Sequence, residues 1–221
     1  MTSQTAEVTA RPSAARVLVI LLIAAVAVMA VRAFLVQSFV IPSGSMSPTL
    51  EPGERVLATP LGAGDLRRGD VIVFDGAGVF APSPPPARNA LVAAGRAVAS
   101  AVGVPVGRSD FVKRVIGLPG ERVTCCDAQG RITVDGVALT EPYVAPGEAP
   151  SMIRFDVRVP AERLWVMGDH RSDSADSRAH LGDPGGGMVP VDHVVGRVVS
   201  VWWPLDRMSS VSRGQPREGT Q

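Results

Sequence analysis

The chain has 221 residues, of which 46% are hydrophobic, 5% aromatic and 19% charged, and 22 basic against 21 acidic side chains give a formal net charge of +1. This balance excludes a strongly basic nucleic-acid-binding protein and an acidic disordered chain. The 23 glycines and 19 prolines disfavour an all-helical fold and favour strands joined by turns. The length allows one domain of roughly 150 to 200 residues with an appendage.

A long apolar segment lies near the N-terminus. Fifteen consecutive apolar residues run from Val17 to Val31, and the sequence then stays mostly apolar as far as Ile41. A helix of 25 residues is about 37 Å long and can cross a hydrocarbon layer of roughly 30 Å with tilt. We therefore predict a short tail at residues 1–16 and a transmembrane anchor at 17–41. A cleaved secretory signal is the alternative, and the flanking arginines leave the orientation of an anchor open.

Beyond Pro42, short β-rich runs alternate with turn residues. Predicted strands cover residues 55–59, 71–74, 111–116, 122–125, 164–167 and 189–203. Residues 131–139 predict a hairpin whose two-residue type I′ turn is Asp135-Gly136. We therefore predict a mostly β domain at residues 42–208 and a disordered tail at 209–221.

Residues 75–110 read as an insertion in this domain. Three consecutive prolines at 84–86 precede an Ala/Val-rich stretch at 87–102 that is compatible with a helix. We expect a surface excursion, and a helix that rests on a lipid surface is the alternative.

The chain has a single lysine, Lys113, whereas its other 21 basic residues are arginines. Lys113 and Arg114 are neighbours in an apolar strand, so their side chains point to opposite faces. A lysine of ordinary pKa, about 10.4, is protonated at pH 7, and burial must lower its pKa before it can accept a proton. Arginine cannot take this role because it stays charged. Chance retention of one lysine is the alternative.

A loop at the end of the apolar segment, residues 41–50, has three serines and one glycine between two prolines, and two of its serines could face one point. Such a loop has a fixed, non-helical shape, although a simple linker is the alternative. The sequence has no G-x-S-x-G, H-E-x-x-H, Walker or S-x-x-K motif. A serine triad with His170 or His180 is less favoured, and His193 fits a structural position in a strand. A serine paired with an amine base remains.

Residues 168–178 pack three aspartates, three serines and two arginines into eleven positions after a predicted strand. A solvated turn and a calcium loop are the alternatives. The segment lacks the glycine and the closing glutamate of an EF-hand loop. A polar network that holds the lysine accounts better for this composition.

Together, these segments resemble the type I signal peptidase family, membrane-bound Ser/Lys endopeptidases that remove signal peptides. The resemblance extends to about Pro204. It rests on P-S-G-S-M-x-P-T-L, R-G-D-V-I-V-F at 68–74, K-R-V-I-G-L-P-G-E and G-D-x-R-x-x-S-x-D-S-R, in that order. It implies a mostly β catalytic domain of antiparallel coiled sheets with one N-terminal transmembrane helix. It also implies a cytoplasmic N-terminus and a catalytic domain on the outer face of the cytoplasmic membrane.

The resemblance also implies roles for individual residues. Ser45 would be the nucleophile and Lys113 the general base, and the backbone N–H of Ser45 and the hydroxyl of Ser43 would form the oxyanion hole. Ser174 would orient the lysine. The surrounding loop would be held by an ion pair of Asp176 with Arg178 and by Asp169 and Arg171. A substrate strand would add to sheet edges near 39–42 and 111–113, with shallow pockets shaped by Phe39, Ile41, Pro42, Met46 and Val112.

The predicted activity is cleavage of secretory preproteins after small residues in an A-x-A-like pattern. We expect preproteins and membrane lipid as partners, no metal or other cofactor, and no nucleic acid, and we predict no oligomeric state. A LexA-like self-cleaving protein would need a DNA-binding domain in place of residues 17–41. An inactive membrane-anchored β binding domain would not need Ser45, Lys113 and Ser174 together.

Two features depart from the family pattern. His170 stands where many members have asparagine. Cys125 and Cys126 are adjacent, whereas better-studied members have a separated pair, and two adjacent cysteines cannot form a zinc site or a disulfide framework. Free thiols and a bridge between the two neighbours are both open.

Overall fold

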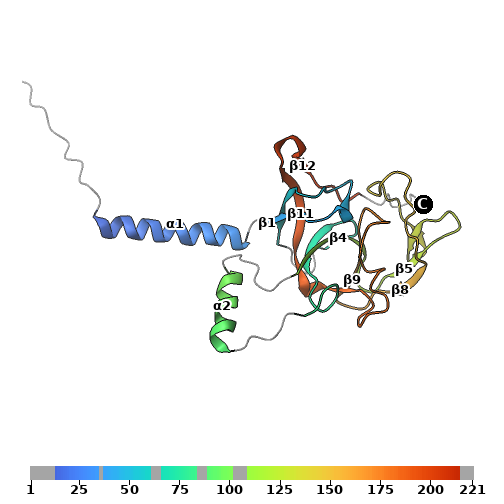
Figure 1. The fold of residues 1–221 in the computed structure, drawn as a ribbon, viewed down its shortest axis with the longest axis horizontal. Coiled ribbons are helices and arrows are strands. Elements are labelled where there is room, and N and C mark those ends of the chain that lie inside the picture. The colour runs from blue at the N-terminus through green and yellow to red at the C-terminus, as the bar shows by residue number, and fades with distance from the viewer. Residues whose placement is uncertain (1–12, 35–36, 61–65, 84–88, 102–108, 215–221) are drawn as a thin grey trace, which may run out of the picture.

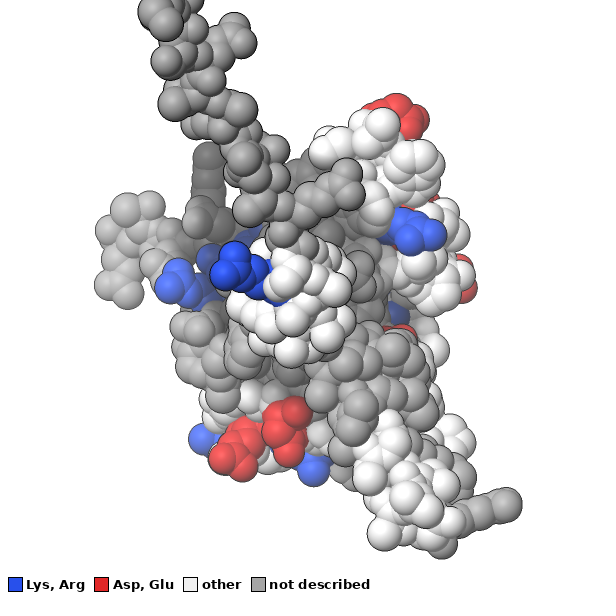
Figure 2. Space-filling model, turned by 90° about the vertical axis from the view of Figure 1, so that its left-hand side faces the viewer, with Lys and Arg blue, Asp and Glu red and all other residues white. Residues whose placement is uncertain are grey.

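A computed structural model describes residues 13–34, 37–60, 66–83, 89–101 and 109–214 (Figure 1). Figure 1 shows a β domain from which the long helix α1 projects on one side, with the shorter helix α2 on that same side. Figure 2 looks onto that side, where basic and acidic side chains are scattered over the described surface.

The helices are α1 (Ala14–Phe34), α2 (Ala90–Ala101) and the short 3₁₀ helices η1 (Gly44–Met46), η3 (Val191–His193) and η4 (Leu205–Arg207). The strands are β1 (Gln37–Val40), β2 (Arg55–Thr59), β3 (Val71–Asp75), β4 (Asp110–Gly117), β5 (Arg122–Cys125), β6 (Ile132–Val134), β7 (Val137–Ala138), β8 (Phe155–Arg158), β9 (Arg163–Met167), β10 (Val189–Pro190), β11 (Val194–Trp203) and β12 (Ser209–Ser210).

The described strands form two sheets. The larger sheet has the order β1-β2-β11-β3-β4-β9-β10, and β12 pairs with β11 beside this path. The smaller sheet has the order β7-β6-β5-β8. Every pairing between these strands is antiparallel. The prediction of a mostly β, antiparallel fold is therefore confirmed.

Strand alternation gives the larger sheet a hydrophobic cluster on each face. Val71 and Val73 of β3 belong to the cluster that contains Met46 and Leu50, whereas Ile72 and Phe74 belong to a different cluster. Because successive strand side chains point to opposite faces, a strand that is buried on both faces is apolar at every position. This explains the uninterrupted V-I-V-F run, and it places β3 in the middle of the domain.

The predicted hairpin is confirmed. β6 pairs with β7, and the residues between them, Asp135 and Gly136, have φ angles of 48° and 82°. A type I′ turn needs positive φ at both central residues, which aspartate and glycine tolerate.

The predicted anchor extends too far toward the C-terminus. α1 ends at Phe34, and Gln37–Val40 is strand β1, which pairs with β2. The side chains of β1 alternate between half-buried and exposed, and the Ser38 hydroxyl accepts a hydrogen bond from the Trp202 indole at 3.0 Å. In the described part of the chain, no helix is long and apolar enough to cross a membrane.

The predicted strand at 189–203 is broken into two. β10 ends at Pro190, η3 follows, and β11 begins at Val194. Proline has no N–H to extend the ladder, and the Val191 N–H bonds to the Glu162 carbonyl at 2.9 Å.

Residues 209–214 of the tail predicted to be disordered are ordered. Ser209 and Ser210 pair with β11, and the Val211 N–H bonds to the Val199 carbonyl at 2.9 Å. Residues 215–221 of that tail lie outside the described residues. In the insertion, α2 falls within the helix-compatible stretch, and its Leu91 side chain is exposed.

Candidate active site

The serine loop is fixed by its apolar side chains. Met46 and Leu50 are buried in a hydrophobic cluster of the domain, and the Leu50 N–H bonds to the Met46 carbonyl at 2.9 Å. The loop is closed where the Ile41 N–H bonds to the Glu54 carbonyl, also at 2.9 Å. Ser45 lies in η1, between the Ile41 hydrogen bond and the buried side chains of Met46 and Leu50, and it faces β4.

Ser45 and Lys113 are in direct contact, although 68 positions separate them in the sequence. The Lys113 Nζ donates a hydrogen bond to the Ser45 Oγ at 2.8 Å and another to the Val112 carbonyl at 3.1 Å. The Ser43 hydroxyl lies 3.4 Å from the Ser45 Oγ. The structure thus brings a hydroxyl nucleophile, an amine and a second hydroxyl to one point.

Burial changes the acidity of the amine. Lys113 is only 4% exposed. Burial lowers its pKa from 10.5 to about 8, and the negative charges of Asp176 and Asp169 oppose part of this decrease. A general base works best when its pKa lies near the working pH. Lys113 therefore has the environment that proton transfer from a serine requires.

Two buried ion pairs hold the carboxylates around this amine. The Arg114 guanidinium binds Asp169 through two hydrogen bonds of 2.8 and 2.6 Å, and the Thr49 hydroxyl donates to the same carboxylate at 2.5 Å. The Arg178 guanidinium also forms a bidentate pair, with hydrogen bonds of 2.9 and 2.7 Å to the Asp176 carboxylate. Burial by itself raises the pKa of the Asp176 carboxyl, but hydrogen bonding and charge from Arg178 keep it below its usual value. Because both carboxylates bind arginines, the calcium alternative is not supported.

Gly168 is a site residue that the sequence analysis did not single out. A Cβ at this position would collide with the Ser174 hydroxyl and with the Ser45 carbonyl oxygen. The Gly168 N–H also donates a hydrogen bond to Asp176 at 2.9 Å, and the His170 N–H donates one to the Ser45 carbonyl at 3.2 Å. The signal was present as the first residue of the G-D-x-R motif.

The hydroxyl of Ser174 is buried, it interacts with the Asp176 carboxyl and helps to lower the pKa of that group, and no hydrogen bond joins it to Lys113 in the described residues. The predicted contact with Lys113 is therefore not seen, and the orienting role of Ser174 stays a prediction. Arg171 braces the same loop, since it donates to the Gly168 carbonyl at 2.9 Å and forms an ion pair with Glu141 at 2.6 Å.

The three histidines have other contacts. The His170 ring lies 3.3 Å from the Gly44 carbonyl through Nδ1 and 3.1 Å from Glu148 through Nε2. His180 contacts Asp183 at 2.7 Å, and His193 contacts the Asp75 carbonyl at 2.9 Å. In the described structure, none of these rings bonds to the Ser45 hydroxyl, so the arrangement favours the lysine as base.

Two strand edges flank the site. β1 is the outer strand of the larger sheet, so one of its edges is free of a partner strand in the described sheet. β4 pairs with β9 only from Arg114 onward, so the first half of β4 pairs with β3 alone. Phe39 and Val112 are half-buried and Pro42 is exposed, whereas Ile41 and Met46 are 2% and 1% exposed. The last two therefore belong to the core and present almost no surface to a ligand.

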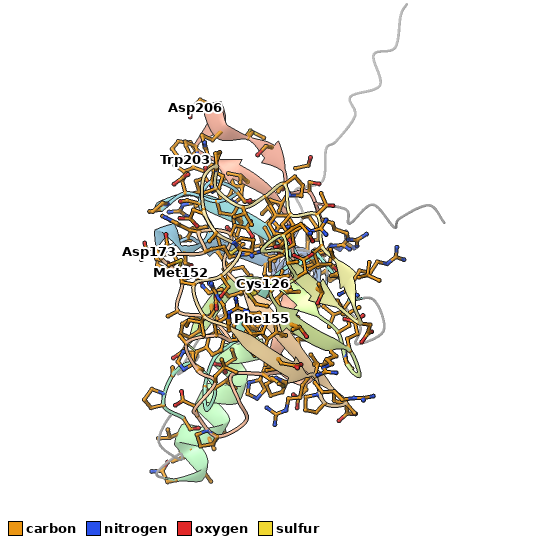
Figure 3. All side chains as sticks on the ribbon, turned by 90° about the vertical axis from the view of Figure 1, so that its right-hand side faces the viewer. Cys126, Met152, Phe155, Asp173, Trp203 and Asp206 are labelled. Atoms are coloured by element: carbon orange, nitrogen blue, oxygen red, sulfur yellow. A yellow bond between two sulfur atoms is a disulfide. The ribbon has the colours of Figure 1, made fainter. Side chains whose placement is uncertain are left out.

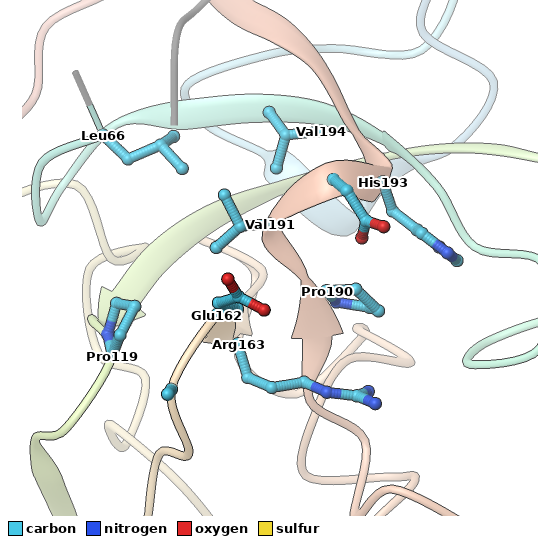
Figure 4. A pocket seen from close by; sticks show the side chains of 10 residues that line it. Leu66, Pro119, Glu162, Arg163, Pro190, Val191, His193 and Val194 are labelled. Carbon is cyan, nitrogen blue, oxygen red and sulfur yellow. The ribbon is translucent and has the colours of Figure 1, made fainter. Parts of the chain in front are cut away.

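Other features lie outside this cluster. The pocket in Figure 4 has a volume of about 1040 Å³ and is lined by Leu66, Pro119, Ala161, Glu162, Arg163, Pro190, Val191, Asp192, His193 and Val194, none of which belongs to the Ser45 cluster. Cys125 and Cys126 form a disulfide, and Cys126 packs against the cluster that contains Phe155 (Figure 3). In the described residues, no group of three or more His, Cys, Asp or Glu side chains is placed to hold a metal ion.

A comparison with known protein families decides how this cluster is interpreted. The family described as signal peptidase, peptidase S26, matches residues 14–203. The chain belongs to this family. Membership makes it a serine endopeptidase, so its chemistry is the hydrolysis of a peptide bond. The match also covers the segment where a LexA-like protein would need a DNA-binding domain.

Relatives with curated names agree with the family. Signal peptidase I of Mycobacterium tuberculosis is 37% identical in an alignment of 226 positions, gaps included, that covers 91% of this chain and 76% of the relative. The enzyme of the same name from Pseudomonas aeruginosa is 31% identical and covers 83% and 71% of the two chains. A solved signal peptidase I from Enterococcus faecalis is 26% identical, with a TM-score of 0.38, over 60% of this chain and 96% of that one.

Proposed function

We propose that this signal peptidase family member removes N-terminal signal peptides from secretory preproteins, cleaving after small residues in an A-x-A-like pattern with a Ser/Lys dyad. The observation that carries the proposal is the 2.8 Å hydrogen bond between the buried Lys113 amine and the Ser45 hydroxyl. Family membership supplies the reaction class, and the geometry supplies a nucleophile and a base.

In the first half of the reaction, the neutral Lys113 amine accepts the proton of the Ser45 hydroxyl while the Ser45 Oγ attacks the scissile carbonyl carbon. The backbone N–H of Ser45 and the hydroxyl of Ser43 donate to the oxyanion that forms. A donor of this kind typically contributes about 2.7 to 4 kcal/mol of transition-state stabilisation. The Lys113 ammonium then gives its proton to the leaving amine, and the C–N bond breaks.

The second half regenerates the enzyme. Lys113, neutral again, accepts a proton from water as the water oxygen attacks the acyl ester on Ser45. Collapse of the second tetrahedral intermediate breaks the ester bond and returns the proton to the Ser45 Oγ. In this cycle Ser174 keeps the lysine in line with Ser45, and its buried hydroxyl also interacts with Asp176, one of the two carboxylates that act on Lys113.

The substrate binds as an extended strand between the edges of β1 and the first half of β4. Backbone hydrogen bonds to such edges give affinity for any sequence, and side-chain pockets give selectivity. Phe39, Pro42 and Val112 line the shallow surface, and the core residues Ile41 and Met46 support it from below. A shallow surface of this kind accepts small side chains and excludes large ones.

The apolar segment anchors the enzyme in the cytoplasmic membrane, with the N-terminus in the cytoplasm and the β domain outside. Support for the anchor comes from the unbroken apolar run from Val17 to Val31. The exposed side chains of the first part of α1, such as Leu18 and Leu22, are apolar and would face lipid. This location puts the site where the cleavage sites of exported proteins emerge.

The test is cleavage of a purified preprotein by the detergent-solubilised wild type and by Ser45→Ala. We expect one cut by the wild type, after a small residue at the end of the signal peptide, and no product with Ser45→Ala. A preprotein whose residue before the cut is changed from alanine to phenylalanine should resist the wild type. Full activity of Ser45→Ala would refute the mechanism.

A further inference from the structure

The last described residues of the chain lie against the arginine that follows Lys113, the proposed general base. We propose that the C-terminal strap, residues 209–214, positions Arg114 and through it the Asp169 carboxylate and Lys113. The strap is thus a working part of the active site that this family member carries at its C-terminus. The effect of the strap on catalysis rests on the proposed function, in which Lys113 is the general base.

The strap is bound along its whole length. It pairs with β11 at Ser209 and Ser210, and Val211 packs against the cluster that also receives Val112, the residue before Lys113. The side chain of Arg213 then forms an ion pair with Asp70 at 2.5 Å, and Asp70 has no exposed surface. Loss of Arg213 would leave the buried Asp70 carboxylate with only the longer ion pair to Arg197 at 3.9 Å, and breaking a pair at a buried charge costs more than breaking an exposed pair.

The strap supplies two of the acceptors that satisfy a buried guanidinium. The Arg114 Nη1 donates to the carbonyls of Ser212 at 3.1 Å and Arg213 at 3.3 Å, in addition to the Gly69 carbonyl at 2.8 Å. The other side of the same guanidinium binds Asp169. Buried charged donors need partners, and removing those partners leaves the charge uncompensated. Without the strap, Arg114 would be drawn toward water and away from Asp169.

The surroundings of the strap are shaped to admit it. A Cβ at Gly69 would collide with the Arg213 carbonyl oxygen, and a Cβ at Gly214 would collide with the ring of Tyr143. That ring lies 4.0 Å from the Arg114 guanidinium carbon, so it covers one face of the charge. Gly69 and Asp70 belong to the R-G-D-V-I-V-F motif, and neither residue has a role in the proposed reaction. Their contacts with the strap give them one.

The link to the base is electrostatic as well as steric. The carboxylates that act on Lys113 are Asp169 and Asp176, which bind Arg114 and Arg178, and both raise its pKa. Loss of the strap would weaken the neutralisation of Asp169 and admit water beside Arg114. Both changes favour the protonated lysine, so the pKa of Lys113 should rise.

Because Lys113 is the only lysine, its titration can be observed directly. Lysine labelled with ¹³C at Cε gives one side-chain signal, whose pH dependence yields the pKa without any substrate. The full-length protein in detergent is compared with a variant ending at Met208, with Arg213→Ala, and with two controls. One control ends at Gly214, and the other is Arg207→Ala, which removes an ion pair with the buried Glu54 that does not contact Arg114.

We expect the variant ending at Met208 and Arg213→Ala to raise the titration midpoint by about one pH unit. That shift lowers kcat/KM near pH 7 about tenfold, because one pKa unit changes the neutral fraction tenfold on the acid side. Both controls should titrate like the wild type. Melting curves identify variants that fail to fold. If the variant that ends at Met208 fails to fold, Arg213→Ala provides the test.

The proposal would be overturned if the titration midpoint of Lys113 were unchanged in a folded variant that ends at Met208 or in folded Arg213→Ala. It would also be overturned if either control shifted the midpoint by the same amount. If the wild type cleaves no preprotein while the midpoint still moves as expected, the proposed function fails and the positioning by the strap stands.

Discussion

At the scale of single residues, the site depends on one amine that is kept out of water. Lys113 is buried beside Ser45, and the two carboxylates whose charge raises its pKa form ion pairs with arginines. This arrangement solves a specific problem, since a nearby uncompensated carboxylate would hold the proton on the amine. In the proposed mechanism a lysine can act as the general base because Asp169 and Asp176 have arginine partners of their own.

The pH dependence of the reaction should report this lysine. Its pKa is lowered to about 8, so the amine is protonated below that pH and cannot accept the serine proton. We expect kcat/KM to fall about tenfold per pH unit below pH 8 and to level off above it. Lys113→Arg should abolish activity, because a guanidinium keeps its proton.

His170→Asn is the matched control for this profile. A histidine base of ordinary pKa, about 6.5, would place the acid limb lower. We expect His170→Asn to keep the limb near pH 8. The lysine mechanism would be wrong if the limb lay near pH 6.5 and His170→Asn were as inactive as Ser45→Ala.

At the scale of elements, the turn after β9 carries the most crowded contact of the site. Gly168 lets the Ser174 hydroxyl and the Ser45 carbonyl approach the backbone together, and it donates its own N–H to Asp176. This turn fixes the position of the serine loop relative to the polar network around the lysine.

Gly168→Ala should therefore lower kcat by at least about tenfold, because misplacement of catalytic groups by 1 Å can cost up to about a hundredfold. The matched control is Gly182→Ala, since a Cβ at Gly182 meets nothing within 4 Å. Steady-state kinetics with a preprotein measure both variants. Equal activity of the two would show that the crowding around Gly168 is unimportant for the reaction.

The elements also show what the sequence can and cannot predict. Arg55–Thr59 and Arg122–Cys125 have the bounds expected from their β-rich composition, and the Asp135-Gly136 turn follows from local backbone preferences. β8 was missed although Phe155 and Val157 alternate with polar residues, because the run is short. The division of residues 189–203 depends on a contact with Glu162, which is distant in the sequence.

The site residues follow the same division. Ser45, Lys113 and the aspartates come from motifs, so the sequence locates them. The burial of Ile41 and Met46 and the binding of the strap to Arg114 depend on tertiary packing. Local patterns contain no information on such distant contacts.

At the scale of the whole molecule, α1 and the β domain are joined at β1. β1 pairs with β2 and leads directly into the serine loop, so the boundary between α1 and the β domain lies before Gln37. The chain can therefore lose its helix without losing a strand of the sheet, but only if the cut is placed before β1.

We expect a variant that lacks residues 1–34 to fold, to stay in the supernatant when lipid vesicles are sedimented, and to cleave a short soluble peptide substrate. A variant that lacks residues 1–40 also loses β1 and should show a lower melting temperature and little activity. Sedimentation, melting curves and peptide cleavage distinguish the two. Equal behaviour of both variants would contradict the role assigned to β1.

The bridge between Cys125 and Cys126 has a consequence for the origin of stability. A disulfide is thought to stabilise a fold mainly by limiting the freedom of the unfolded chain, and that effect grows with the length of the closed loop. Here the bridged residues are neighbours in the sequence, so the closed ring restricts little of the unfolded chain beyond these two residues. The entropic benefit of the bridge is therefore small, and the cohesion of the fold has to come from the packing of its two sheets.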